Sequence, residues 1–115
     1  MNSQNGGEDG DSPHVGPIIF ENKTARSQLL DEGEVTTFRT SDRTTGETWA
    51  RASRTGPKIA DVTVKHDRST EAPSPDVLAP FADLSGFGTA ERWWDAILDV
   101  HGLPSEGHIY RVTVR

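Results

Sequence analysis

Four runs of alternating apolar and polar residues predict a small β-sheet. Three of them follow one another closely, at 35–40, 48–53 and 58–66, and a fourth covers 108–115. The two-residue period is typical of strands that bury one face. The turns between the first three runs are short, so these strands are expected to run antiparallel. An apolar segment at 17–20 is either a first strand or an extended segment that docks on the core.

Two helices are predicted beside the strands. The first begins at a cap provided by Asn22 or Thr24, continues to about Glu32 and stops at Gly33, because a glycine readily adopts the left-handed conformation of a helix end. The second covers 89–101 and is the strongest helix of the chain. Its broad apolar stripe consists of Trp93, Trp94, Ile97, Leu98 and Val100.

These elements indicate an α+β fold: a small curved or closed β-barrel, mostly antiparallel, with two main helices covering its openings. The length of 115 residues suits one domain, which we place at 17–115. Residues 1–16 are acidic and lack apolar periodicity, so they are predicted to be a disordered tail. Residues 67–80 are rich in serine and proline and are predicted to form a loop, with one short helical turn near 76–78.

The composition disfavours several classes of function. The chain has no cysteine, and its histidines lack close metal-ligand spacing, so neither a metal nor another cofactor is predicted. There is no run of about 20 apolar residues and no signal peptide, so we expect no membrane partner and a cytoplasmic location. A serine hydrolase is also disfavoured, because the sequence has no Gly-x-Ser-x-Gly elbow. The histidines are His14, His66, His101 and His108.

Charge is distributed unevenly along the chain. The net charge is -6, yet residues 39–58 carry five basic and two acidic side chains, a local charge of +3 that leaves -9 for the rest. A basic island in an acidic protein is compatible with a local anion site, whereas the alternative is that these arginines only solvate strand edges. Arginine outnumbers lysine nine to three, and this composition resembles that of proteins from salt-loving archaea.

Six side chains on or beside the first core strands are candidates for binding a nucleotide or RNA. Arginine offers planar, multidentate donors to phosphate and stacks on bases, and an exposed tryptophan provides a stacking surface. The alternative is a network of salt bridges around a tryptophan that belongs to the core. A protein-interaction module that uses the helix with Trp93 and Trp94 is a further possibility, with no partner indicated. The six candidates are Thr37, Arg39, Trp49, Arg51, Arg54 and Lys58.

Several short motifs between residues 27 and 114 occur in an informative order. They are Leu29 to Gly33, Val35 to Arg39, a turn at Gly46, Ala60 to Val64, Gly86 with Phe87 before the tryptophan-containing helix, and Ile109 to Val114. In this order they resemble the ASCH domain family, which belongs to the PUA-like superfamily of β-barrels. The resemblance implies recognition of RNA, of nucleotides or of modified bases. In small bacterial members it also implies hydrolysis of the acetyl amide of 4-acetylcytidine.

Matched to those hydrolases, Thr37 and Arg39 fit the threonine and arginine of the first core strand, and Asp83 can stand for a later acidic residue. The resemblance therefore implies an alternative function, an amidohydrolase acting on an acylated pyrimidine nucleoside. Thr37 would be its nucleophile, Asp83 its acid or base, and Lys58 or Arg39 its oxyanion donor. The family's lysine position, however, falls on Glu34. A carboxylate there reverses the charge that would help to activate the threonine, so binding is favoured over catalysis.

Overall fold

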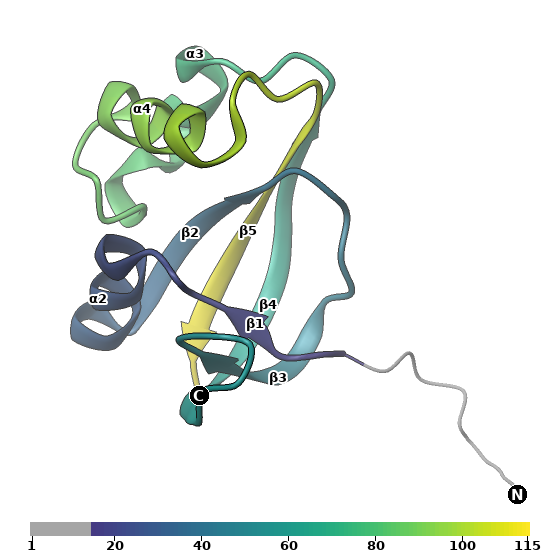
Figure 1. Ribbon diagram of the computed structural model, residues 1–115, viewed down its shortest axis with the longest axis vertical. Coiled ribbons are helices and arrows are strands. Elements are labelled where there is room, and N and C mark those ends of the chain that lie inside the picture. The colour runs from purple at the N-terminus through teal and green to yellow at the C-terminus, as the bar shows by residue number, and fades with distance from the viewer. Residues whose placement is uncertain (1–14) are drawn as a thin grey trace, which may run out of the picture.

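The computed structural model describes residues 15–115 as an α+β domain whose sheet curls into a half-barrel (Figure 1). The strands are β1 (Ile18–Ile19), β2 (Glu34–Arg39), β3 (Gly46–Arg51), β4 (Lys58–Thr70) and β5 (Gly107–Val114). The helices are α2 (Lys23–Glu32), α3 (Pro75–Leu78), a 3-10 helix (Ala79–Leu84) and α4 (Ala90–His101). In Figure 1, α3 and α4 gather at one end of the sheet, while α2 lies beside β2 nearer the other end.

The five strands are arranged in the order β1-β3-β4-β5-β2. Within residues 15–115, only β1 pairs in parallel, with β3, and the three other pairings are antiparallel. The predicted α+β fold with a small, curved and mostly antiparallel sheet is confirmed. The sheet remains open between β1 and β2, so it is a half-barrel and not a closed barrel.

Both ends of α2 follow the sequence prediction. The side chain of Asn22 accepts a hydrogen bond from the backbone N–H of Ala25 at 3.1 Å, so Asn22 is the N-terminal cap. Gly33 ends the helix with a φ of 81°, a left-handed conformation that favours glycine. The second predicted helix is also confirmed, since α4 begins after a cap by Thr89 and ends before Gly102.

The loop predicted at 67–80 is wrong at both of its ends, whereas the short helical turn predicted near 76–78 is confirmed by α3. Strand β4 continues to Thr70, because its polar end finds hydrogen-bonding partners along β5. Helical structure then begins at Pro75, after Ser74 caps the backbone N–H of Val77. Proline is well tolerated in the first turn of a helix, where its missing N–H has no partner to lose. Only residues 71–74 therefore lack regular structure in this segment.

The two faces of the sheet carry two separate apolar cores. The first core packs α2 and β1 against the sheet and comprises Ile18, Phe20, Ala25, Leu29, Val35, Ala50, Val62, Val64, Tyr110 and Val112. The second packs α3, α4 and the 3-10 helix and comprises Phe38, Leu78, Ala82, Ala90, Trp93, Ile97 and Ile109. Strands β2 and β5 contribute to both cores, because successive side chains point to opposite faces. Both faces of these two strands are therefore buried in part.

The tail predicted at 1–16 lies outside the described residues except for Val15 and Gly16. The carbonyls of these two residues accept hydrogen bonds from Thr48 Oγ1 at 3.1 and 3.0 Å. Nη2 of Arg43 donates to the Gly16 carbonyl as well, at 2.9 Å. The folded domain therefore includes the segment immediately before β1.

Gly107 is predicted to be intolerant of substitution, because the ring of Phe38 occupies the space where its Cβ would lie. Gly107→Ala should lower the free energy of unfolding by about 1–3 kcal/mol, the usual cost of overpacking a core. Urea unfolding followed by tryptophan fluorescence measures this change. Gly16→Ala is the control, since nothing lies within 4 Å of its added Cβ. Equal stability of the two variants would contradict the predicted packing of Phe38 on Gly107.

Candidate functional site

On the first face of the sheet, three neighbouring strands change from apolar to polar in the same direction. Along β2 the side chains on this face are Val35, Thr37 and Arg39. Along β5 they are Val112, Tyr110 and His108. Along β4 they are Val64, His66 and, after a bulge, Ser69. The register pairs Arg39 with His108 and His108 with Ser69. A polar band therefore crosses the sheet beyond the first apolar core.

Arg39 is an enclosed cation within this band. Its guanidinium carbon lies 5.2 Å from the centroid of the Phe20 ring, within the range of a cation–π contact. Burial and the positive charge of Arg43 lower the pKa of the Arg39 guanidinium to about 10, with a smaller opposing effect of Tyr110. Arg39 therefore keeps its charge at neutral pH, although its surroundings disfavour that charge.

Among residues 15–115, Arg39 has no salt bridge to an acidic side chain. Its Nε is buried and makes no hydrogen bond there. The Arg39 side chain as a whole is half-buried, and a charge that is partly removed from water without an acidic partner costs free energy. The arrangement favours an anion as an additional partner.

A cleft of about 640 Å³ opens where β2, the start of α2 and α4 meet, and we call it the β2 cleft. Its polar lining consists of Glu21, Asn22, Thr36, Thr37, Arg39, Thr40, Ser41, Arg54 and His101. Its aromatic lining consists of Phe20, Phe38, Phe87 and Trp93. Because β2 is an edge strand, the cleft is bounded by elements that reach it from both faces of the sheet.

The β2 cleft unites only some of the predicted site residues. Thr37, Arg39 and Arg54 line it, although Thr37 is only 7% exposed. Trp49 pairs with Asp61 and lies on the opposite face of the sheet from the first core. The predicted set therefore does not form one site.

The remaining candidates have other neighbours. Nε of Arg51 donates to the carbonyl of Gly56 at 3.1 Å. Nζ of Lys58 lies 3.0 Å from a carboxylate oxygen of Asp61, in an exposed ion pair. Asp83 is exposed on the 3-10 helix and is not part of the cleft lining.

Comparison of the chain with family models, with curated proteins and with solved structures finds no match. The site is therefore interpreted from its own geometry. Over residues 15–115, no helix has both the length and the apolar character needed to cross a membrane. In the same part of the chain, no three histidine, aspartate or glutamate side chains are grouped so that they could hold a metal ion.

Tyr110 connects the sheet to the loop after β2. Its hydroxyl donates a 2.7 Å hydrogen bond to Oδ1 of Asp42 and accepts one of 2.9 Å from the backbone N–H of Arg43. Burial and the Asp42 hydrogen bond raise the pKa of Tyr110, so its hydroxyl remains a proton donor at neutral pH. The loop that follows Arg39 is thereby held against β5.

Sequence reasoning missed a hydrogen-bonded chain at the other side of the polar band. Nε2 of His66 lies 2.7 Å from Ser69 Oγ, and Ser69 Oγ lies 2.8 Å from Nδ1 of His108. Nε2 of His108 in turn lies 2.6 Å from Oε2 of Glu106. The cluster joins two local pairs, His66 with Ser69 and Glu106 with His108, which are 39 residues apart at the Ser69–His108 contact, so spacing alone could not reveal it. Of the other histidines, His101 lines the β2 cleft and His14 lies outside the described residues.

A bulge in β4 aims Ser69 at His108. His66 pairs with Tyr110 and Arg68 with Ile109, so Asp67 is an extra residue in β4. Without this extra residue, the two-residue period would place His66 and Ser69 on opposite faces. The bulge therefore brings both side chains to the face that carries His108.

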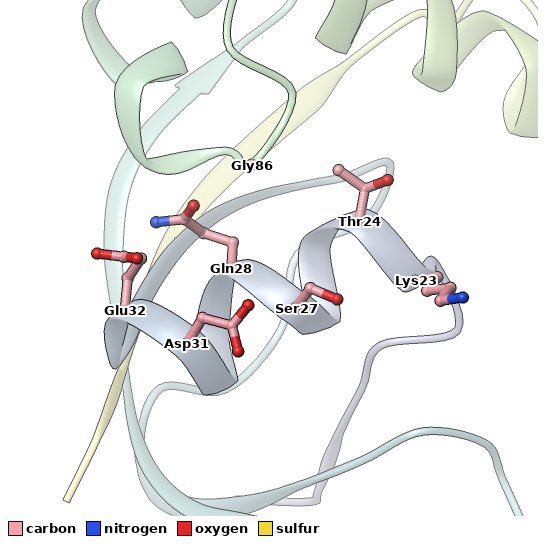
Figure 2. A pocket seen from close by; sticks show the side chains of 7 residues that line it. All are labelled: Lys23, Thr24, Ser27, Gln28, Asp31, Glu32 and Gly86. Carbon is pink, nitrogen blue, oxygen red and sulfur yellow. The ribbon is translucent and has the colours of Figure 1, made fainter.

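A second hollow lies along the outer side of α2 (Figure 2). It measures about 400 Å³ and is lined by Lys23, Thr24, Ser27, Gln28, Asp31, Glu32 and Gly86. Gln28 already donates to the carbonyl of Glu34 at 3.1 Å. The lining is shallow and of mixed charge, with no aromatic side chain, so the β2 cleft is the better candidate for a ligand.

The hydrogen bond between Tyr110 and Asp42 predicts a pH-dependent contribution to stability. The Tyr110 hydroxyl, followed by the backbone N–H of Arg43, lowers the pKa of Asp42 in the folded state. The carboxylate thus stabilises the fold above the unfolded aspartate pKa of about 3.9, and this contribution is lost as the pH falls through the lowered pKa. The stability difference between wild type and Tyr110→Phe, measured by urea unfolding, should be largest near neutral pH and should shrink in acid.

Asp42→Asn provides the matched control, because the amide cannot titrate. In the Asp42→Asn background, the effect of Tyr110→Phe should be nearly constant with pH. Stability curves of wild type and Tyr110→Phe that stay parallel from neutral pH into acid would contradict the proposed coupling.

Proposed function

We propose that this domain binds a nucleotide, free or as a unit of an RNA strand, in the β2 cleft. The observation that carries the proposal is Arg39, an enclosed guanidinium without an acidic partner among residues 15–115. A phosphate bound there would supply the missing negative charge and accept hydrogen bonds from the guanidinium. It would thereby relieve the cost of the unpaired cation.

The rest of the lining suits the other parts of a nucleotide. Phe87 is half-buried and offers aromatic surface for a base, whereas Trp93 is only 3% exposed and supports the wall of the cleft. Thr40 and Ser41 offer hydroxyl groups for a sugar or a phosphate. The cleft volume of about 640 Å³ falls within the usual range for small-molecule sites. Arg54 is an exposed second cation that can adjust to a longer anionic ligand.

The same proposal includes the relationship to ASCH domains in the PUA-like superfamily. It is supported by the motif order in the sequence and is compatible with a curled, mostly antiparallel sheet that has helices at its ends. Since Thr37 lies in the cleft, 4-acetylcytidine belongs among the ligands to be tested. Asp83 does not line the cleft, and Glu34 stands at the family's lysine position, so we propose binding and not amide hydrolysis.

Replacement of Arg39 by glutamine is predicted to weaken nucleotide binding about tenfold to a hundredfold. The reason is the loss of hydrogen bonds to a charged group, which contribute about 1.5–3 kcal/mol. Titrations of 15N-labelled protein with cytidine monophosphate, adenosine monophosphate, 4-acetylcytidine and a short single-stranded RNA measure the effect by NMR. Shifts are expected at Thr37, Arg39 and Phe87.

Arg92→Gln is the matched control, because Arg92 is exposed on α4 and is not part of the cleft lining. This variant should bind as the wild type does. Titrations at low salt and at about 1 M salt separate close contacts in the cleft from long-range attraction, since the Debye length falls to about 3 Å at 1 M. The proposal fails if none of the ligands shifts the cleft resonances, or if Arg39→Gln binds as tightly as Arg92→Gln.

A further inference from the structure

A second set of side chains on the same face is arranged for nucleophilic chemistry. Ser69 Oγ lies 2.8 Å from Nδ1 of His108, and Nε2 of His108 lies 2.6 Å from Oε2 of Glu106. A nucleophile beside a base that is oriented by a third group is the geometry of an activated hydroxyl. We propose that Ser69 is a nucleophile that accepts acyl groups from carboxylic esters, with His108 as its general base and Glu106 as a positioning residue.

The hydrogen bonds determine which nitrogen of His108 acts as the base. A carboxylate only accepts hydrogen bonds, so the contact with Glu106 places the His108 proton on Nε2. In a neutral imidazole, Nδ1 then carries the lone pair. The Ser69 hydroxyl must therefore donate its proton toward His108, the direction that nucleophilic attack requires.

His66 completes the arrangement around Ser69. Because the Ser69 proton points toward His108, the oxygen accepts the remaining contact from His66 Nε2–H, at 2.7 Å. When Ser69 forms a bond to a carbonyl carbon, this N–H becomes available to the oxygen that gains negative charge. His66 thus offers one donor of the kind that stabilises an oxyanion.

The chemical step balances without a cofactor. Ser69 Oγ forms a bond to the ester carbonyl carbon, the carbonyl π electrons move to its oxygen, and the hydroxyl proton passes to Nδ1 of His108. Collapse of the tetrahedral intermediate breaks the bond to the leaving alkoxide, which takes up the proton from His108. Water then attacks the acyl carbon and gives a proton to His108. Collapse of this second tetrahedral intermediate breaks the bond between that carbon and Ser69 Oγ and releases the carboxylic acid. Ser69 regains a proton from His108.

In this cluster the nucleophile is accessible to solvent, and its base is held in a fixed position. Ser69 is exposed, whereas the side chain of His108 is only 11% exposed and is therefore held in place by its surroundings. The bulge at Asp67 turns Ser69 toward His108, and bulges commonly re-aim side chains beside functional sites. The nucleophile and its base are thus presented by paired, neighbouring strands and not by a free loop.

Labelling with an alkyl fluorophosphonate tests the proposal directly. Attack by Ser69 forms an Oγ–P bond and breaks the P–F bond, so fluoride leaves and a stable adduct remains. Peptide mapping by mass spectrometry should place the adduct on Ser69, and Ser69→Ala should abolish it. The same protein should release nitrophenolate from 4-nitrophenyl acetate. His108→Asn should slow both reactions about a hundredfold or more, the usual contribution of general-base catalysis.

Matched variants separate this activity from other causes. Ser27→Ala should keep full labelling, because Ser27 is an exposed serine on α2 that has no imidazole partner within residues 15–115. Glu106→Gln should slow labelling and Glu106→Asp should restore part of it, as expected for a group that orients His108. Arg92→Gln should also leave labelling unchanged, because Arg92 is exposed on α4 and is not part of this hydrogen-bonded cluster. Labelling is carried out without nucleotide, so its outcome is independent of nucleotide binding. Circular dichroism confirms that each variant is folded.

Three results would overturn the proposal. One is wild-type protein that carries no fluorophosphonate adduct on Ser69. Another is an equal amount of adduct on Ser69 and on Ser27. The third is labelling of Ser69 at the wild-type rate in a folded His108→Asn variant.

Discussion

Strand β5 contributes side chains to the apolar cores on both faces of the sheet, and most of the described chain depends on the packing of these two cores. Tyr110 and Val112 belong to the first core and Ile109 to the second, and all three are fully buried. Burial of a large apolar side chain contributes about 1.5–3 kcal/mol. β4 and β2 pair with opposite edges of β5, so a change of register in β5 would exchange the side chains of both cores.

This two-sided burial also decides where polar chemistry is possible. On the first face, Arg39 and His108 are register partners just beyond the apolar residues. Arg39 reaches the β2 cleft, whereas His108 meets Ser69 on the other neighbouring strand. A distance of about 10 Å is expected between the backbones of β2 and β4, given a strand spacing of about 4.8 Å. The proposed anion site and the proposed nucleophile therefore share a scaffold but have different immediate surroundings.

The basic residues between 39 and 58 show which part of a binding site can be predicted from the local sequence. Arg39 and Arg54 line the same cleft, but Lys58 forms an exposed pair with Asp61. Trp49 lies on the opposite face from Thr37 because of its position in the strand pairing. Alternation along one strand could be derived from the sequence, whereas the relation between faces of different strands required the register. Charge counting therefore identified the region but could not decide which cations converge.

By itself, the sequence determined the strand alternation, the approximate ends of the two long helices and the presence of Thr37 and Arg39 on one face, since these depend on neighbours within a few residues. The tertiary structure alone decided that Arg39 is enclosed without an acidic partner in residues 15–115. It also decided that Ser69 meets His108, through one extra residue in β4. The physical reason is that enclosure and hydrogen bonding between distant residues depend on strand register, and a bulge reverses the side to which all later residues point.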